Sequence, residues 1–271
     1  MHILIERQYL MSLFESAVQA HYPNIVDTPI SIGNRFNFAI NEPEVREALG
    51  VINGGSISKS ELLSIWANER DYSFKTKFLL TLFWGHVRPI NLQYILADDG
   101  LDCKLYKLEC ALHDFEDFSD KKLDKRHPYD DIQSLYKELE CGEMRIKGLK
   151  AAFFTKIFFF FFATHTTFFS ENGTQIIIAD EWMKKAVYAQ ITETFPEMLN
   201  IIFSPGTKYP CGFNFKGRSS SEAYFNFLKV FEMEKNALLF KYPELDSFAL
   251  EGYVFASKDL IDEYYRQAIG R

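Results

Sequence analysis

From residue 58 onward, apolar side chains recur three and four positions apart, which is the period of a helix with one buried face. Ser58 stands three residues before Glu61, a spacing typical of a helix start, because the hydroxyl and the carboxylate cap opposite donors of the first turn. A second apolar stripe leads to Trp84 and Gly85, where the glycine can end a helix. The pattern therefore predicts one helix beginning at Ser58 and a second that buries Phe74, Phe78, Leu79, Leu82 and Phe83.

The same period predicts further helices along the chain: a stripe from Leu105 to Phe115, a short helix over 131–140 closed by Gly142, a stripe from Tyr224 to Phe231, and a last helix over 259–269. The charged run at 120–126 is interpreted as a solvated face or loop. The first fifty residues show no clear period and contain three prolines, so we expect irregular structure there with one helix near 9–21. This divides the chain into an N-terminal portion, residues 1–57, and a helical body, residues 58–271.

The most apolar stretch runs from Ala151 to Phe169 and contains five consecutive phenylalanines, 158–162. It also contains Lys156 and several threonines, which makes a lone membrane-spanning helix unattractive and favours a helix buried on nearly all sides. The N-terminus has no secretory signal pattern. We therefore expect a cytoplasmic protein that does not engage a membrane.

Composition supports a mostly α fold and limits the partners. The chain has 27 Phe but only 14 Gly and 9 Pro, which leaves little material for a turn-rich sheet protein. Its formal charge of −7 argues against bulk attraction to phosphate, so any nucleic-acid site must be a local patch.

The cysteines and histidines give no metal signature. No CxxC pair is present, and the spacing of seven positions from Cys103 to Cys110 predicts two buried thiols on one helix. The histidines share no ligand spacing, and His86, beside Trp84 and Gly85, is the only one that we would test for a role. No metal or cofactor is expected.

One segment combines several features with chemical meaning. Residues 146–156 describe a turn around Gly148 that leads directly into a helix, and backbone N–H groups at such a helix start can bind phosphate without net positive charge. Lys147 and Lys150 add charge beside the turn. An apolar run at 175–179, predicted to be extended, then delivers Asp180 to the next helix start, so Lys156 and Asp180 are expected to face each other across a cleft.

These motifs resemble a known family. The Gly-Leu turn at 148–149, Ala-Phe-Phe-Thr-Lys at 152–156, the aromatic helix and the apolar run ending in Asp180 resemble bacterial proteins with an 8-oxoguanine DNA glycosylase fold, within the helix-hairpin-helix DNA glycosylase superfamily. Phe-Trp-Gly at 83–85 is similar to that family's Trp-Gly segment, and 250–255 is similar to a segment with Glu and Phe near the family's end. The similarity spans about residues 58–256.

The resemblance implies two helical subdomains flanking a cleft that holds the substrate base, with the helix-hairpin-helix at about 144–163. The family's hairpin usually has glycine at both turn positions, whereas here Gly148 matches the first and Lys150 occupies the second. The catalytic lysine of the best-known oxidised-guanine enzymes begins the following helix, where this chain has Ala152, and Lys156 lies one turn later. A shift of one turn keeps roughly the same helix face, so Lys156 is the candidate that matches.

The implied partner is double-stranded DNA with a modified base, and the implied reaction is cleavage of the N-glycosidic bond. This cleavage builds positive charge on the sugar, which the Asp180 carboxylate would stabilise, or the carboxylate would orient a water molecule. Lys156 as a free amine would attack the sugar and form a Schiff base, which adds strand cleavage; without it the enzyme only hydrolyses. Since the base must leave the stack, Trp84, Phe153 and Trp182 are the candidate lining of its pocket.

The last candidate DNA contact is a basic aromatic loop at 206–217, together with Arg218, which follows it. Its functional interpretation is a DNA contact through Lys208, Lys216 and Arg218, and its structural one is an ordinary glycine-rich connection.

Structural alternatives exist for the other candidates as well. Asp180 is suited to a helix N-cap, Lys156 can extend to solvent, and Trp84 and Trp182 can be core residues. The alternative function is a catalytically inactive helix-hairpin-helix protein that binds DNA or a partner. The base is also open: oxidised guanine, or a modified base of foreign DNA, which would make this an anti-phage defence protein.

Overall fold

The computed structural model describes residues 12–24, 27, 29–32, 35–36, 39, 41–52, 55–117, 128–165, 176–203 and 220–270. Within these ranges the chain is mostly helical, as the composition predicts. The strands of the described part are β1 (Ile30–Ser31) and β2 (Ser56–Ile57), which pair antiparallel.

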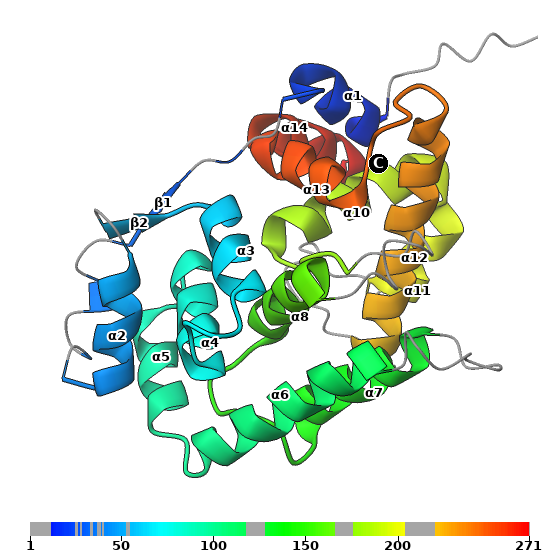
Figure 1. The fold of residues 1–271 in the computed structure, drawn as a ribbon. Helices are drawn as coiled ribbons and strands as arrows, with labels where there is room; N and C mark the ends of the chain where they lie inside the picture. The colour runs from blue at the N-terminus through cyan, green and yellow to red at the C-terminus, as the bar shows by residue number, and fades with distance from the viewer. Residues whose placement is uncertain are drawn as a thin grey trace, which may run out of the picture.

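The helices follow one another closely along the chain (Figure 1). In order they are α1 (Leu13–His21), α2 (Pro43–Val51), α3 (Lys59–Ala67), α4 (Phe74–Trp84), α5 (Pro89–Leu96), α6 (Leu101–Asp117), α7 (Pro128–Cys141), α8 (Ala151–His165), α10 (Glu181–Thr194), a 3-10 turn (Pro196–Met198), α11 (Leu199–Ile202), α12 (Ser220–Leu239), α13 (Ser247–Ala256) and α14 (Lys258–Ile269).

The predicted helix start is confirmed at α3, and the predicted end of α4 is found, but with a different residue in the left-handed conformation. Ser58 accepts a hydrogen bond from the backbone N–H of Glu61, and the Glu61 carboxylate accepts one from the N–H of Ser58, which completes the predicted capping box. At the end of α4 the two closing bonds run from the N–H of His86 to the carbonyl of Phe83 and from that of Val87 to Leu82, the pattern of a Schellman motif. The left-handed residue of that motif is His86 and not Gly85.

The helices α2, α5, α11 and α13 were not expected. α2 and α5 each begin with a proline in the first turn, where its missing N–H costs nothing, and α13 begins after Asp246, whose side chain caps the helix. One of the three prolines that indicated irregular structure in the first fifty residues, Pro43, thus begins a helix instead. The predicted burial of the thiols is also wrong: Cys103 and Cys110 lie on α6 with free, exposed side chains, because that face of the helix points to solvent.

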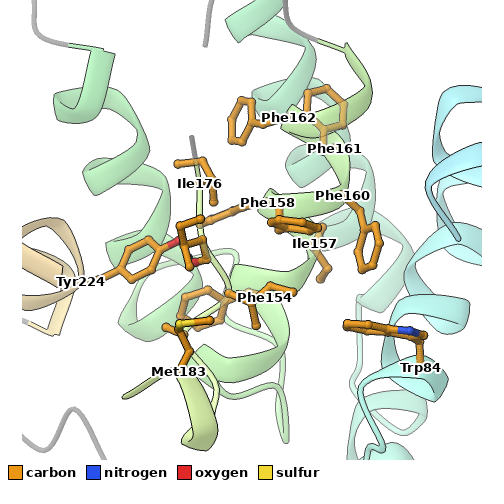
Figure 2. Close-up of a cluster of buried hydrophobic side chains, with 14 of the residues drawn as sticks. Trp84, Phe154, Ile157, Phe158, Phe160, Phe161, Phe162, Ile176, Met183 and Tyr224 are labelled. Carbon is orange, nitrogen blue, oxygen red and sulfur yellow. The ribbon is translucent and has the colours of Figure 1, made fainter. Parts of the chain in front are cut away.

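Helix α8 forms the centre of the core. Residues 154–162 are all buried, and Phe158, Phe160 and Phe161 are completely or almost completely inaccessible, so the expected all-round burial is confirmed. Figure 2 shows its side chains spreading in opposite directions, with Phe154 and Phe158 toward Tyr224 and with Phe160 toward Trp84. None of the described helices is both long and apolar enough to cross a bilayer.

Two groups of helices lie on either side of α8 (Figure 1). α3 and α4 pack directly on α8, and α2 packs on α4. On the other side α10 packs along α14, and α1 packs against α13, α10 and α14. The N-terminal helix is therefore joined to the C-terminal group, while the division at residue 57 stays a prediction.

Candidate functional site

A cavity of about 690 Å³ lies between these two groups of helices. Its walls come from the end of α1, the start of α3, the turn after α4, the first turns of α8 and α10, the second half of α13 and the start of α14. Its volume falls in the range of about 300–1,000 Å³ that is usual for small-molecule sites.

Lys156 and Asp180 both line this cavity. The Lys156 Nζ lies 3.6 Å from Asp180 Oδ2 and donates a hydrogen bond to the Ala152 carbonyl at 3.2 Å. Lys156 is only 5% exposed, so its ammonium does not extend to solvent. The two residues therefore face one another as the sequence predicts.

Local structure positions Asp180 at the cavity wall. The segment 176–179 is fully buried and belongs to no helix or sheet of the described residues, and the backbone of Asp180, which follows it, is extended. The backbone of this segment is held by two side chains: the N–H of Ala179 donates to Thr155 Oγ1, and the Tyr224 hydroxyl donates to the carbonyl of Ile177. Asp180 Oδ1 then accepts from the N–H of Met183 and caps α10. The structural and the functional interpretation of Asp180 thus use different oxygens of the same carboxylate.

Gly85 leaves room for the lysine. A Cβ atom at this position would lie 3.0 Å from Lys156 Cδ, 3.1 Å from Phe153 Cε1 and 3.1 Å from the Thr81 carbonyl oxygen. Since the φ of Gly85 is −74°, a larger residue would be crowded here by contact and not by backbone conformation. The close approach of α4 to the first turn of α8 therefore favours glycine at this position.

The three predicted aromatic residues also line the cavity. Trp84 is 6% exposed and packs edge-on against Phe160, and its buried indole N–H has no hydrogen-bond partner among the described residues. Buried donors are seldom left in this state. Phe153 and Trp182 are half-buried, so their rings are partly accessible from the cavity.

A buried ion pair that the sequence does not predict lies in the same cavity. Lys59 Nζ contacts the Glu251 carboxylate, and the ammonium also lies 4.5 Å and 4.1 Å from the ring centres of Phe159 and Phe248. Asp27 adjoins the pair and accepts from the backbone N–H of Lys59. No motif connects positions 59 and 251, so only the folded chain brings this pair together.

Three basic side chains, Arg35, His86 and Lys258, lie together at the solvent-exposed side of the cavity. His86 and Lys258 both line the cavity and are exposed, and Arg35 Nη1 donates to His86 Nδ1 at 2.6 Å. Burial lowers the pKa of His86, and the charges of Arg35, Lys258 and Lys156 lower this pKa further. Lys258 also lies over the rings of Phe255 and Trp182, with its Nζ 4.5 Å and 5.5 Å from their centres.

The turn at Gly148 lies outside the cavity lining. Gly148 has a φ of +87°, and a Cβ atom there would lie 2.8 Å from the Asn91 carbonyl oxygen of α5, so both conformation and contact require glycine. Lys147 and Lys150 are exposed on either side. The N–H of Lys147 donates to the Asp98 carboxylate at 2.6 Å and is therefore not free for a phosphate.

The predicted contacts Lys208, Lys216 and Arg218 lie outside the described residues, so their role stays a prediction. Comparison of the chain with protein-family models, with curated proteins and with solved structures finds no significant match.

Proposed function

We propose that this protein is a DNA glycosylase that extrudes a modified base into the cavity and cleaves its N-glycosidic bond. The observation that carries the proposal is the pair formed by the buried Lys156 and the partly buried Asp180, whose Nζ and Oδ2 lie 3.6 Å apart in the wall of a cavity lined by Trp84, Phe153 and Trp182.

Asp180 has the properties that the reaction needs. Departure of the base leaves positive charge on the sugar, and a fixed carboxylate stabilises that charge without rearranging at the moment of reaction. The hydrogen bond from Met183 fixes one oxygen of Asp180, so the other oxygen points to a defined place beside Lys156.

Lys156 is the candidate nucleophile. Its amine attacks the sugar C1′ only as the free base, and Asp180 Oδ2 is the nearest carboxylate oxygen to accept the proton. A bond from Nζ to C1′ then replaces the bond from C1′ to the base, and the departing base takes the proton that Asp180 accepted. One of the two protons left on Nζ moves to the ring oxygen as the bond from C1′ to that oxygen breaks, which gives a protonated Schiff base. If Lys156 stays protonated, Asp180 instead orients the attacking water.

The arrangement around the cavity supports a DNA substrate. Aromatic rings stack on an extruded base of any identity, and the cavity between the two helix groups fits the two subdomains and cleft of the helix-hairpin-helix glycosylases. In this proposal α7, the Gly148 turn and α8 form the helix-hairpin-helix motif. Lys147 and Lys150 then lie beside the backbone of one DNA strand. Oxidised guanine and a modified base of foreign DNA are the two substrate classes that we propose.

Base release from a panel of modified duplexes, including phage DNA with substituted cytosines, tests the proposal by mass spectrometry. Asp180→Asn is expected to lower release by about a hundredfold to a thousandfold, because asparagine caps a helix as well as aspartate but carries no charge. Asp246→Asn is the matched control, since Asp246 caps α13 and does not line the cavity. Equal rates in both variants contradict the role of Asp180.

Borohydride trapping tests the nucleophile. We expect wild-type protein to form a covalent adduct with its substrate DNA and Lys156→Met to form none. Lys77→Met is the control, because Lys77 is 5% exposed and donates to the Trp66 carbonyl, as Lys156 does to Ala152, but lies outside the cavity. Base release without an adduct assigns the attack to water. A protein that binds DNA and releases no base from any duplex is a binding module, and the glycosylase proposal is then wrong.

A further inference from the structure

The second residue after the end of α4, His86, is in an unusual backbone conformation. His86 has a φ of +55° at the position of the Schellman motif that glycine usually occupies. A side chain in the left-handed region is destabilising, and such residues cluster at functional sites. The neighbouring Gly85 has an ordinary φ, so the left-handed conformation falls on the histidine. The imidazole at position 86 therefore lowers the stability of the fold relative to glycine.

The hydrogen bond from Arg35 defines the state of that imidazole. An arginine only donates, so Nδ1 of His86 accepts, and the proton of the neutral ring lies on Nε2. Arg35 thus orients the ring and leaves the Nε2–H as a donor for a ligand.

The charge around His86 is not compensated. Arg35 and Lys258 have no carboxylate partner among the described residues. Three of the acidic side chains that line the cavity are paired with lysines: Glu251 with Lys59, Asp180 with Lys156, and Glu181 with Lys185. The fourth, Asp27, accepts hydrogen bonds from Ser60 and from the backbone N–H of Lys59, at the start of α3. In a chain of net charge −7, the solvent-exposed side of the cavity is therefore locally positive.

We propose that Arg35, His86 and Lys258 form a phosphate-binding site that holds a backbone phosphate of the extruded nucleotide. This inference rests on the proposed DNA substrate. An arginine fork, an imidazole N–H and an ammonium supply the donors that phosphate oxygens accept, and all lie beside the cavity that would receive the base. The phosphate is thereby held close to the sugar that Asp180 and Lys156 approach.

A first test uses inorganic phosphate and the NMR titration of the histidines. Burial and, to a smaller extent, nearby cations lower the pKa of His86, so a bound anion that offsets those cations is expected to raise its midpoint toward the ordinary value of about 6.5. His113 lies outside this cavity and serves as the internal reference. A His86 midpoint that moves no more than that of His113 overturns the site.

A second test measures binding to a duplex with a non-cleavable abasic analogue at several salt concentrations. The double variant Arg35→Gln/Lys258→Gln is expected to bind at least tenfold more weakly, with a log–log salt slope smaller by about one per phosphate contact removed. Arg266→Gln/Lys229→Gln changes the net charge equally at exposed positions outside the cavity. An unchanged slope in the first variant, or equal losses in both, contradicts the proposal.

His86→Gly separates binding from folding. Glycine relieves the left-handed strain, so the melting temperature is expected to rise by about 2 °C while DNA binding weakens. A variant that is less stable, with unchanged binding, shows that His86 has a structural role only.

These readouts do not depend on catalysis. If the protein releases base but the double variant keeps the wild-type slope, the phosphate site is wrong and the glycosylase stands. If no duplex releases base, yet the double variant loses DNA binding and phosphate shifts His86, the site stands and the glycosylase proposal fails. A His86 shift by phosphate without any effect on DNA binding assigns the site to a free phosphorylated molecule and overturns the proposal.

Discussion

At the scale of single residues, the shape of the cavity depends on a glycine as much as on the larger side chains that line it. Gly85 lacks the Cβ atom that would touch Lys156 and Phe153, and this absence lets the end of α4 lie against the first turn of α8. The position of the lysine is thus set from a neighbouring helix and not only by its own rotamer.

Gly85→Ala is therefore expected to displace Lys156 and to lower base release about tenfold or more, since small misplacements of reacting groups have large effects on rate. The φ of −74° suits alanine, so the backbone itself is not strained. Gly252→Ala is the matched control: Gly252 lines the same cavity, and nothing lies within 4 Å of its added Cβ atom. Equal rates in the two variants would show that the Gly85 contact does not position the lysine.

At the scale of elements, a buried polar network fixes α10 to its neighbours. The Glu234 carboxylate of α12 accepts from Gln190 Nε2 at 2.8 Å and from the Thr194 hydroxyl at 2.9 Å. Gln190 Oε1 in turn accepts from the N–H of Phe14 in α1. Since Asp180 begins α10, this network holds the helix that carries the candidate catalytic carboxylate.

The network has a predictable pH dependence. Burial raises the pKa of Glu234, and the hydrogen bonds from Gln190 and Thr194 only partly oppose this shift. A folded-state pKa above the unfolded value means that the contribution of Glu234 to stability is greatest below the unfolded pKa. That contribution is lost as pH rises through the folded pKa.

Glu234→Gln should remove this loss, because the amide remains neutral and its NH₂ group can donate to Thr194 Oγ1. We expect the variant to gain stability relative to wild type, by on the order of 1 kcal/mol, as pH rises from about 4 to neutrality. Urea unfolding at a series of pH values measures the difference. The exposed Glu222→Gln on the same helix is the control, and a difference between Glu234→Gln and wild type that does not vary with pH would contradict the assignment.

At the scale of the whole molecule, net charge and local charge have opposite signs at the candidate site. The chain carries −7, yet two cations without a carboxylate partner among the described residues, Arg35 and Lys258, lie beside His86 at one cavity, whose walls include helices from both ends of the sequence (Figure 1). For the proposed DNA substrate, this local positive charge favours a site for a single extruded nucleotide over general attraction of the whole acidic protein to DNA.

The sequence by itself determined the features that depend on near neighbours in the chain. The capping box at Ser58, the end of α4, the turn at Gly148 and the all-round burial of α8 each follow from residues within a few positions, and all are found. The order of turn, lysine, extended segment and aspartate also led to the Lys156–Asp180 pair. Prolines were the main source of error, because the same residue that interrupts a helix is favoured in its first turn.

Only the tertiary structure decided what else surrounds that pair. Lys59 meets Glu251, and Arg35 meets His86, across separations that no local pattern records. The exposure of Cys103 and Cys110 was likewise set by the face that α6 turns to solvent. Helix formation is governed by hydrogen bonds between residues four apart, whereas a cavity forms where distant helices pack together, and its chemistry is therefore a property of the packing.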